Sequence, residues 1–591
     1  MQREIKKRAT VYGLVAVLSA IMLGAFAYNL QVYPPESSLP SMLLRTFSSY
    51  NELRSFLLTN SRTQGAFPVY GPWDQAILTT QTFGDASLVR FVTNALAPKI
   101  EYSTTNIQVA GVDEADIVKT DGEYIYLVSG NNVSIVKAYP PTGAEVLSKI
   151  TFSNDTYPVG IFVGRDRLAV SGSKYTFSSP VYEPYRVDIK TFVNVYDISE
   201  KTQPVSLKNF TMSGSYFNSR MIGDYVYFVV SQPAYVIYDT VILPKIYTDD
   251  GITEISASEI HYSNASDNYF MFTTVVALNM QNTAEEPTHL TIMLGGTSSM
   301  YVSLNNIYIT FPEPDAKTSI YRMRIEKSTV ITEAHGKVPG RELNQFSMDE
   351  YNNYFRIATT TWVNGTVQSN VYVLNMNLNI VGSLENIAPS ETLDSARFLG
   401  NRCYLSTSVV RRDPFFVIDV ENPSDPKILG YLKIPGFTRY LHPYDETHII
   451  GIGKDGSNVK ISLFDVSNVS APIEIGKPYA VNASWSDTLV LTEHKAFLFD
   501  KSKNLLVIPV SLYEDWYSQW QGAYVFNITL TNGLVLKGSV THQEAGVNGW
   551  DSGYWVKRSL YIENVLYTVS DKKIKMNSLE DLTQINEIKF P

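Results

Sequence analysis

Short apolar runs separated by turn residues follow one another along most of the chain. Runs such as YIYLV at 124–128 and YVYFVV at 225–230 are rich in aromatic and β-branched side chains, which pack well on a pleated surface. Turn residues precede each run, and Gly122 and Gly223 can supply the positive φ that tight hairpins need. The pattern predicts a succession of short antiparallel strands from about residue 113 to the end of the chain.

Four such strands form a unit that repeats, and the connection between the third and fourth strands keeps one spacing. In three copies a proline follows an aspartate by seven positions. The aspartate can accept backbone N–H groups across the turn, while the proline sets φ for the next strand. These pairs are Asp197 and Pro204, Asp419 and Pro426, and Asp465 and Pro472. Nine units are counted, spaced mostly 44 to 60 residues apart.

A unit of this kind cannot bury both of its faces alone, whereas units stacked around an axis bury each other's faces. The repeats therefore predict an all-β fold, a β-propeller of eight or nine four-stranded blades over residues 101–591. An array of β-sandwiches is the alternative, and the lack of linkers between units disfavours it. Longer insertions at about 173–188 and 232–268 are expected to project from one face as loops, where partners usually bind.

The N-terminal segment has a different pattern. Residues 1–8 form a basic cytoplasmic segment, and residues 9–28 carry no charge over a length that spans roughly 30 Å of hydrocarbon as a helix. Positive charge before such a span holds the N-terminus inside the cell. The segment predicts a transmembrane signal-anchor, with the bulk of the chain extracytoplasmic. A cleaved signal peptide and a secreted product are the alternative, with a cleavage site at 25–27.

Residues 29–100 are expected to be a spacer between the membrane and the repeats. Three prolines between residues 34 and 40 mark an extended start. The capping box Ser49-x-x-Glu52 and apolar positions at helical spacing then predict a short amphipathic helix. These apolar positions are Tyr50, Leu53, Phe56 and Leu57. The mixed segment 61–100 is expected to pack on the side or bottom of the propeller.

The charge of the chain narrows the choice of partners. The formal net charge is −10 and the basic block lies at the N-terminus, whereas a nucleic-acid-binding face needs clustered lysine and arginine. Nucleic acid is therefore excluded as a partner.

The single cysteine, Cys403, cannot form an intramolecular disulfide and is expected to lie buried in a strand. Eight sequons suit a glycosylated external protein and begin at Asn132, Asn154, Asn209, Asn264, Asn364, Asn468, Asn482 and Asn527.

Tryptophan and tyrosine residues gather in two connections near the C-terminus, with carboxylates between them. The candidate ligand- or partner-binding residues are Tyr513, Trp516, Tyr517, Trp520, Trp550, Asp551, Tyr554 and Trp555. Exposed flat rings beside carboxylates can stack on sugar faces or anchor a protein partner. The alternative is that the two connections fold over the propeller and bury the rings as a cap.

Asp113, Glu114 and Asp116 place three carboxylates just before the first inner strand. Such a cluster could bind Ca²⁺ or act as acids in the central channel, or it could accept hydrogen bonds from the backbone and Lys119.

Residues 451–456 match a GxGxxG pattern but lie between two strands, so a hairpin turn is predicted. The histidines form no metal-binding pattern. No catalytic residue, metal or cofactor is predicted.

Four stretches of the chain carry a resemblance to a known family. They are STTNIQVAGVDEADIVKTDGEYIY at 103–126, PGFTRYLHPYDETHIIGIG at 435–453, HKAFLFDKSKNLLVIPV at 494–510 and VKRSLYIENVLYTVSDKKIK at 556–575. Together they resemble the secreted beta-propeller domain proteins of archaea and bacteria, which are distantly related to WD-repeat propellers. The resemblance extends over nearly all of the chain beyond residue 45. It implies export and a propeller fold, and it implies no activity and no catalytic residues.

The anchor, the repeats and the lack of a catalytic constellation predict a membrane-anchored binding or scaffold module at the cell envelope. Its expected partners are the membrane, through the N-terminal helix, and envelope proteins or glycans. An enzyme, such as a hydrolase or lyase that uses carboxylates in the channel, is the second hypothesis. A metal- or redox-dependent propeller is the third, and the scarcity of clustered histidine and cysteine argues against it.

Overall fold

The computed structural model describes residues 44–61, 100–178, 186–248, 251–263, 270–408, 412–514, 519–544 and 549–590. The predicted basic segment and transmembrane anchor, residues 1–28, lie outside these ranges, as does most of the predicted spacer. Among the described residues, no helix has the length and apolar character needed to cross a bilayer.

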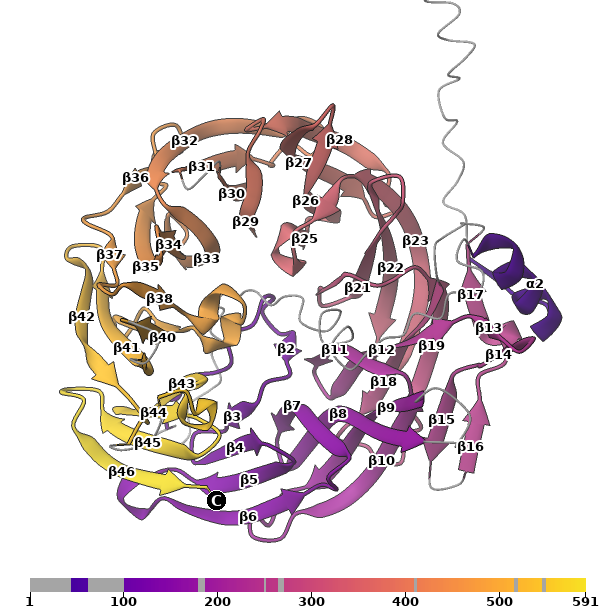
Figure 1. Ribbon diagram of the computed structural model, residues 1–591, viewed down its shortest axis with the longest axis horizontal. Coiled ribbons are helices and arrows are strands. Elements are labelled where there is room, and N and C mark those ends of the chain that lie inside the picture. The colour runs from indigo at the N-terminus through magenta and orange to yellow at the C-terminus, as the bar shows by residue number, and fades with distance from the viewer. Residues whose placement is uncertain are drawn as a thin grey trace, which may run out of the picture. The chain divides into compact units, whose positions relative to one another are not determined.

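Sheets of four or more strands follow one another in chain order around a central axis (Figure 1). The described residues form nine such sheets. The first strand of each lies nearest the axis, and the later strands step outward to the rim. This arrangement confirms the predicted propeller of four-stranded blades, and the alternative of separate β-sandwiches is wrong.

Blades 1 to 5 comprise the following strands. Blade 1 has β3 (Val118–Thr120), β4 (Tyr124–Ser129), β5 (Asn132–Lys137) and β6 (Glu145–Thr151). Blade 2 has β7 (Thr156–Gly164), β8 (Arg167–Ser178), β9 (Arg186–Asp197) and β10 (Val205–Ser213), and blade 3 has β11 (Ser215–Ile222), β12 (Tyr225–Ala234), β18 (Phe270–Asn279) and β19 (Thr288–Leu294). Blade 4 has β20 (Ser299–Val302), β21 (Asn306–Pro312), β22 (Lys317–Glu326) and β23 (Thr329–Pro339). Blade 5 has a divided first strand, β24 (Arg341–Glu342) and β25 (Met348–Tyr351), then β26 (Tyr354–Val363), β27 (Thr366–Asn375) and β28 (Ile380–Ile387).

Blades 6 to 9 complete the ring. Blade 6 has β29 (Thr392–Leu399), β30 (Arg402–Ser408), β31 (Arg412–Asp419) and β32 (Lys427–Pro435), and blade 7 has β33 (Phe437–Asp445), β34 (His448–Asp455), β35 (Asn458–Asp465), β36 (Ile473–Glu474) and β37 (Tyr479–Ala480). Blade 8 has β38 (Trp485–Asp487), β39 (Leu498–Asp500), β40 (Leu505–Tyr513), β41 (Gln519–Thr529) and β42 (Gly533–Val540). Blade 9 has β43 (Arg558–Ile562), β44 (Val565–Val569), β45 (Lys573–Ser578) and β46 (Gln584–Lys589). Short 3₁₀ turns lie in the connections at η1 (Pro141–Gly143), η2 (Ala257–Glu259), η3 (Gln345–Ser347), η4 (Leu489–Leu491), η5 (His494–Ala496) and η6 (Ser552–Tyr554).

The turns follow the local sequence signals. Asp197 accepts the backbone N–H of Ser199 at 2.8 Å, and Asp465 accepts that of Ser467 at the same distance. In these two copies and in the third, the fourth strand begins at the residue after the proline. Residues 451–456 lie in the hairpin of β34 and β35, as predicted. The aspartate–proline spacing is therefore a turn device of the blade.

Buried tyrosines link neighbouring blades. Tyr227, Tyr308 and Tyr567 lie on the second strands of blades 3, 4 and 9, and each is at most 3% exposed. Each hydroxyl donates a hydrogen bond of 2.7 Å to the next blade; the acceptors are the carbonyl of Lys327, the carboxylate of Glu350 and the carbonyl of Ala138. Because a buried hydroxyl needs a partner, these bonds fix how one blade sits on the next. The bond from Tyr567 joins blade 9 to blade 1.

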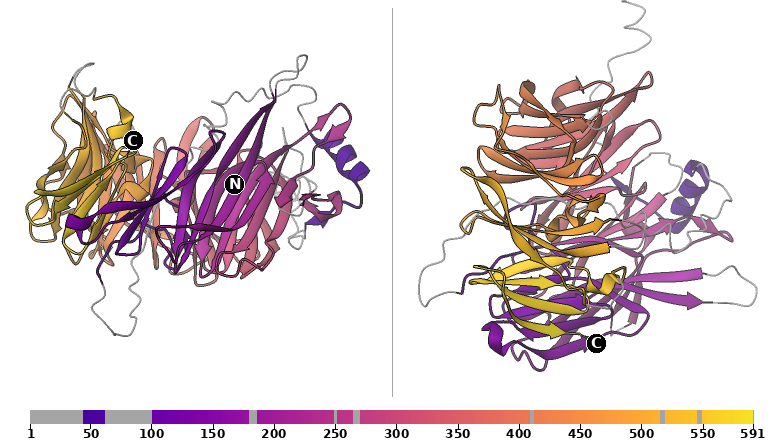
Figure 2. Two further views of the ribbon diagram at one scale, coloured as in Figure 1. Left: turned by 90° about the horizontal axis from the view of Figure 1, so that it is seen from below. Right: turned by 60° about the vertical axis from the view of Figure 1, so that its left-hand side comes forward.

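The two insertions differ from the loops that the sequence predicts. The first lengthens β8 and β9 to 12 residues each, and the hairpin that they form projects beyond the neighbouring strands (Figure 2). Residues 179–185, between the two strands, lie outside the described residues. The second adds β15 (Lys245–Thr248) and β16 (Gly251–Glu254) to the edge of blade 2 and β17 (Ile260–Tyr262) to that of blade 3. It also contains the small hairpin of β13 (Val236–Ile237) and β14 (Thr240–Val241). Free strand edges capture these segments because their backbone groups are unpaired.

The predicted amphipathic helix is present as α2 (Tyr50–Asn60). The Ser49 hydroxyl caps it by accepting the backbone N–H of Glu52 at 3.2 Å. Leu53 and Leu57 are buried against the second insertion, and β1 (Arg45–Thr46) pairs with β17 beside them. The helix thus packs on the side of the propeller, as Figure 1 shows.

Residues 100–116, which we name the axial segment, begin by adding an inner edge to blade 9. The backbone N–H of Ser103 donates to the Tyr561 carbonyl at 3.0 Å, and that of Glu563 donates to the Glu101 carbonyl at 2.7 Å. A Cβ on Gly122, whose φ is +100°, would come within 2.6 Å of the neighbouring Tyr102 ring. Residues before the first blade therefore close the ring on the last one.

The axial segment then crosses the centre of the ring. Asn106 donates to the Tyr440 hydroxyl in blade 7 at 3.1 Å, and Gln108 donates to the Gln345 carbonyl in blade 5 at 3.0 Å. The chain turns back through β2 (Asp113–Glu114), which pairs with β11 of blade 3. In this way a single segment contacts blades on opposite sides of the axis (Figure 1).

A buried ion-pair network holds the axial segment at its turn. The Glu114 carboxylate is 1% exposed, and its Oε2 lies 3.5 Å from the Arg220 guanidinium and 3.5 Å from Nε2 of His494. Its other oxygen accepts the backbone N–H of Gln108 at 3.1 Å. Burial opposes ionisation of Glu114, but the charges of Arg220 and His494 outweigh that cost and hold its pKa well below the ordinary value.

The two neighbouring carboxylates make similar pairs. Asp113 accepts from the Lys119 ammonium of blade 1 at 2.7 Å, and Asp116 accepts from Nε of Arg558 in blade 9 at 2.9 Å. Asp116 and Arg558 are both 4% exposed. The acidic side chains therefore fasten the axial segment to blades 1, 3, 8 and 9.

Replacing Glu114 with glutamine should lower the free energy of unfolding by about 3–5 kcal/mol, because Arg220 would keep a buried charge without its counter-charge. Denaturant titration measures the change. The matched control is Glu286→Gln, which removes an 80%-exposed partner of Lys208 and should change that free energy by less than about 0.5 kcal/mol. Equal effects of the two substitutions would contradict the stabilising role of the axial pair.

The same pair predicts a pH dependence. The pKa of Glu114 is lowered in the folded protein, so its contribution to stability is complete above its unfolded-state pKa, near 4.5, and is lost as pH falls below that value. The stability difference between the unsubstituted protein and Glu114→Gln should therefore be largest at about pH 6.5 and shrink by about pH 3.5. Denaturation midpoints at both pH values test this. A difference that is constant with pH would rule out the proposed charge pairing.

Candidate functional site

Three aromatic side chains, Trp485, Tyr513 and Trp550, form a row on blade 8 and the connection that follows it. The centroid of the Tyr513 ring lies 4.4 Å from that of Trp485 and 5.6 Å from that of Trp550. Trp485 and Tyr513 are directly opposite each other on β38 and β40, so sheet pairing brings them together. Trp485 is 38% exposed and Trp550 is 44% exposed. We name these three residues the aromatic row.

Polar groups border the aromatic row. The Lys454 ammonium lies 4.6 Å from the centroid of the Trp485 ring and pairs with Asp487 at 3.1 Å. Glu514, next to Tyr513, is exposed and accepts from the Ser484 hydroxyl at 3.2 Å. Rings with adjacent hydrogen-bond acceptors can bind a ligand that has both apolar faces and hydroxyl groups.

The structure separates the aromatic residues that the sequence predicts into two groups. It brings Tyr513 and Trp550 together, and it adds Trp485, which the sequence reasoning missed. Sequence proximity could not reveal this contact, although the register of β38 and β40 would have shown it. The predicted residues Trp516 and Tyr517 lie outside the described residues.

The remaining candidates face other contacts. The Trp520 ring lies 5.5 Å from that of Tyr524, and the Trp555 indole N–H donates to the Gly549 carbonyl at 3.1 Å. Asp551 pairs with Lys572 at 2.8 Å, and the same ammonium lies over the Tyr554 ring. All four candidates are half-buried. These four residues are therefore separate from the contact of Tyr513 with Trp550, and a binding role for the candidates stays a prediction.

The three candidate channel acids are engaged in the axial network. Asp113, Glu114 and Asp116 each accept a hydrogen bond from a backbone N–H as well as pairing with a cation. An acid catalyst at neutral pH needs a raised pKa, whereas that of Glu114 is lowered. The structural interpretation of these residues fits the geometry better than the catalytic one.

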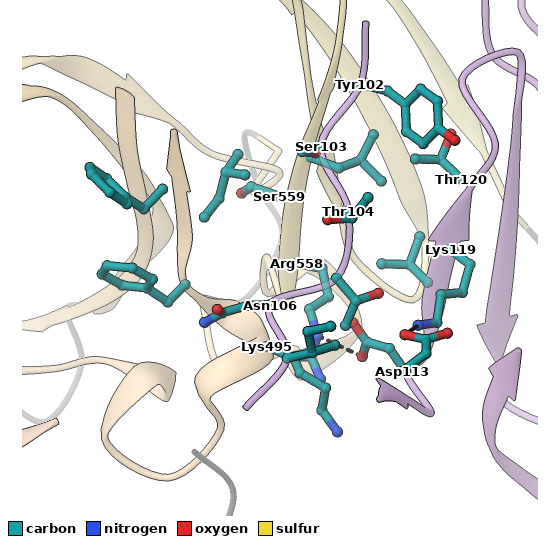
Figure 3. A pocket seen from close by; sticks show the side chains of 18 of the residues that line it. Tyr102, Ser103, Thr104, Asn106, Asp113, Lys119, Thr120, Lys495, Arg558 and Ser559 are labelled. Atoms are coloured by element: carbon teal, nitrogen blue, oxygen red, sulfur yellow. Dashed lines mark hydrogen bonds and ion pairs between the residues drawn. The ribbon is translucent and has the colours of Figure 1, made fainter. Parts of the chain in front are cut away.

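A concave feature beside the axial segment, which we name the axial cavity, has a volume of about 670 Å³ (Figure 3). The axial segment forms one wall, and residues on the inner strands of blades 1, 2, 3, 7, 8 and 9 form the others. Figure 3 shows Thr104, Ser559 and the pair of Lys119 and Asp113 around it. The axial cavity lies at the opposite end of the blades from the aromatic row, because Tyr513 ends the antiparallel second strand of blade 8.

Several single residues also have defined places. Cys403 is fully buried in β30, as predicted, and burial raises the pKa of its thiol. His542 is buried and bonded to Thr568 and Ser570. Within the part of the chain that the structure describes, no three histidine, cysteine or carboxylate side chains are grouped to hold a metal ion.

Seven of the eight predicted sequons fall within the described ranges. Asn132 is half-buried, and its side chain contacts Asn131 and Thr151. Asn264 lies outside the described residues. The exposed sequon residues are Asn154, Asn209, Asn364, Asn468, Asn482 and Asn527. Six sites are therefore accessible to a glycosylating enzyme, and their modification stays a prediction.

Comparison with known proteins places the chain among archaeal relatives. It is 25% identical over 675 aligned positions to an uncharacterized protein of Archaeoglobus fulgidus, which covers 98% of this chain and 99% of the relative. It is 28% identical over 569 positions to an uncharacterized protein of Methanocaldococcus jannaschii, which covers 83% of each. A solved structure of a protein from Lactobacillus plantarum covers 54% of this chain and 92% of its own, with 13% identity and a TM-score of 0.34.

The sequence pattern of one family extends over nearly all of the ring. The family described as "Beta propeller domain" matches residues 102–582, from the start of the axial segment's strand pairing to the last blade. The repeated sheets and this match agree with the resemblance found in the sequence. The chain belongs to the beta propeller domain family.

Proposed function

We propose that the protein is a non-catalytic binding module outside the cytoplasm, anchored in the cell membrane, and that it docks glycans of the envelope on the aromatic row. The observation that carries this proposal is the contact of three aromatic rings whose two tryptophans remain 38% and 44% exposed. Large exposed rings that lie together are typical of binding surfaces, whereas single exposed rings are ordinary.

The groups around the row favour a glycan over a protein partner. A pyranose has an apolar face that stacks on an aromatic ring and hydroxyl groups that bond to carboxylates. Asp487 and Glu514 lie next to the rings in the sequence and offer such acceptors. A protein-binding centre is instead depleted of charged groups.

The position of the acids favours binding over catalysis. Hydrolysis by paired carboxylates needs one acid that is protonated near neutral pH. Glu114 is held ionised by Arg220, and Asp116 is committed to Arg558. We therefore prefer the binding module to a hydrolase or lyase.

The external location rests on the sequence of residues 1–28. Deletion of residues 9–28 should move the protein from the membrane fraction to the soluble fraction, because the uncharged stretch is the only proposed anchor. Fractionation of cells that express both forms measures this, and protease treatment of intact cells tests exposure. Full protection of the unaltered chain in intact cells would contradict an external location.

Simultaneous replacement of Trp485 and Trp550 with alanine should weaken glycan capture by about tenfold or more, because two stacking surfaces are lost. Glycan arrays and crosslinking to isolated cell envelopes measure capture. The matched control is Trp362→Ala, which removes a 58%-exposed indole on blade 5 and should leave capture unchanged.

Three outcomes decide the proposal. Loss of glycan capture in the double variant alone supports it. Unchanged capture in the double variant removes the aromatic row as the docking surface. Crosslinking to a protein that depends on both tryptophans would keep the surface and replace glycan with protein as the partner.

A further inference from the structure

We propose that the axial cavity is a second and separate binding site, which takes a small neutral polyhydroxylated molecule such as a free sugar. Its volume of about 670 Å³ lies within the range of small-molecule sites, roughly 300–1,000 Å³. The cavity does not share a residue with the aromatic row. The inference therefore stands apart from the proposed function.

The walls of the axial cavity combine apolar and polar surface. Phe497, Phe499 and Leu560 contribute apolar faces from blades 8 and 9. Thr104 and Thr105 contribute hydroxyl groups from the axial segment, and neither side chain is hydrogen-bonded in the described structure. This is the composition expected of a site that stacks the C–H face of a ring and bonds its hydroxyl groups.

Two buried or half-buried carboxylates in the cavity keep one oxygen without a hydrogen bond. Asp116 is 4% exposed and uses Oδ1 for both the Arg558 guanidinium and the backbone N–H of Ile117. Asp113 likewise uses Oδ1 for Lys119 and its neighbouring backbone. Among the described residues, Oδ2 of each accepts nothing. Solvent reaches both Oδ2 atoms, so a ligand hydroxyl in the cavity can donate a hydrogen bond to either one.

The charges in the cavity favour a neutral ligand over an ionic one. Each free oxygen belongs to a carboxylate that a cation already neutralises, at 2.7 Å for Lys119 and 2.9 Å for Arg558. An ionic ligand of either sign would meet groups of its own charge, because the wall carries the cations Lys119, Lys495 and Arg558 and the carboxylates Glu101, Asp113, Asp116 and Asp500. A ligand with hydroxyl donors satisfies the free oxygens and adds no charge that the site would have to desolvate.

A substitution that fills the cavity tests the site without removing a protein contact. Thr104→Trp puts an indole into the cavity. The threonine side chain that it replaces makes no hydrogen bond in the described structure. The matched control, Thr253→Trp, adds the same group to an exposed position on β16. Isothermal titration calorimetry with glucose, galactose, mannose and myo-inositol measures binding. Ethanolamine and acetate serve as the cationic and anionic probes.

We expect at least one neutral probe to bind the unaltered protein and the control, and Thr104→Trp to lose that binding. The isosteric variant Thr104→Val, which removes only the hydroxyl, should weaken binding by about threefold to tenfold and keeps the test decisive if the tryptophan variant fails to fold. Glycan capture by the aromatic row should be unchanged in Thr104→Val, which separates this inference from the proposed function. Binding of ethanolamine or acetate alone, absence of binding by every probe, or equal binding by all variants would overturn the proposal.

Discussion

The pairing of Glu114 with Arg220 and His494 sets a constraint on the whole ring. A carboxylate that is 1% exposed stays ionised only while neighbouring charges offset the loss of water. One neighbour belongs to blade 3 and the other to blade 8, so they meet the axial segment only when the blades surround it. The ion pairs are costly to separate and specific in geometry. They therefore tie closure of the ring to the position of one short segment.

Closure by the axial segment also separates the two ends of the propeller. The segment forms a wall of the axial cavity, where the inner strands end, while the aromatic row lies where β40 ends on blade 8. Leu498 in the cavity wall pairs with Val507, six residues before Tyr513 on β40, so about 20 Å along the strand separates the two features. A ligand at one end does not compete for contacts with a ligand at the other. The fold thus offers two surfaces of different shape, one an exposed row of rings and the other a cavity open to solvent.

Features with a local cause could be predicted from the sequence. Asp197 and Asp465 each accept a hydrogen bond from a residue two positions away, and Ser49 caps α2 by accepting one from a residue three positions away. The neighbouring residues in the sequence were therefore enough to predict these turns and this cap. The blades themselves could be predicted because apolar runs preceded by turn residues recur along the chain. The candidate site was predicted only in part. Tyr513 and Trp550 were found, but Trp485 reaches them through strand register.

Local sequence was enough to predict the repeated strands, their turns and a surplus of aromatic side chains, because these depend on short-range backbone preference and on the period of apolar residues. Which aromatic rings meet, and which partners the acidic side chains find, depends on how the blades pack against one another. Asp116 pairs with Arg558, which lies 442 positions later in the chain. The two residues meet because the ring brings the last blade next to the axial segment. Contacts of this length depend on how the blades pack, and no local pattern records them.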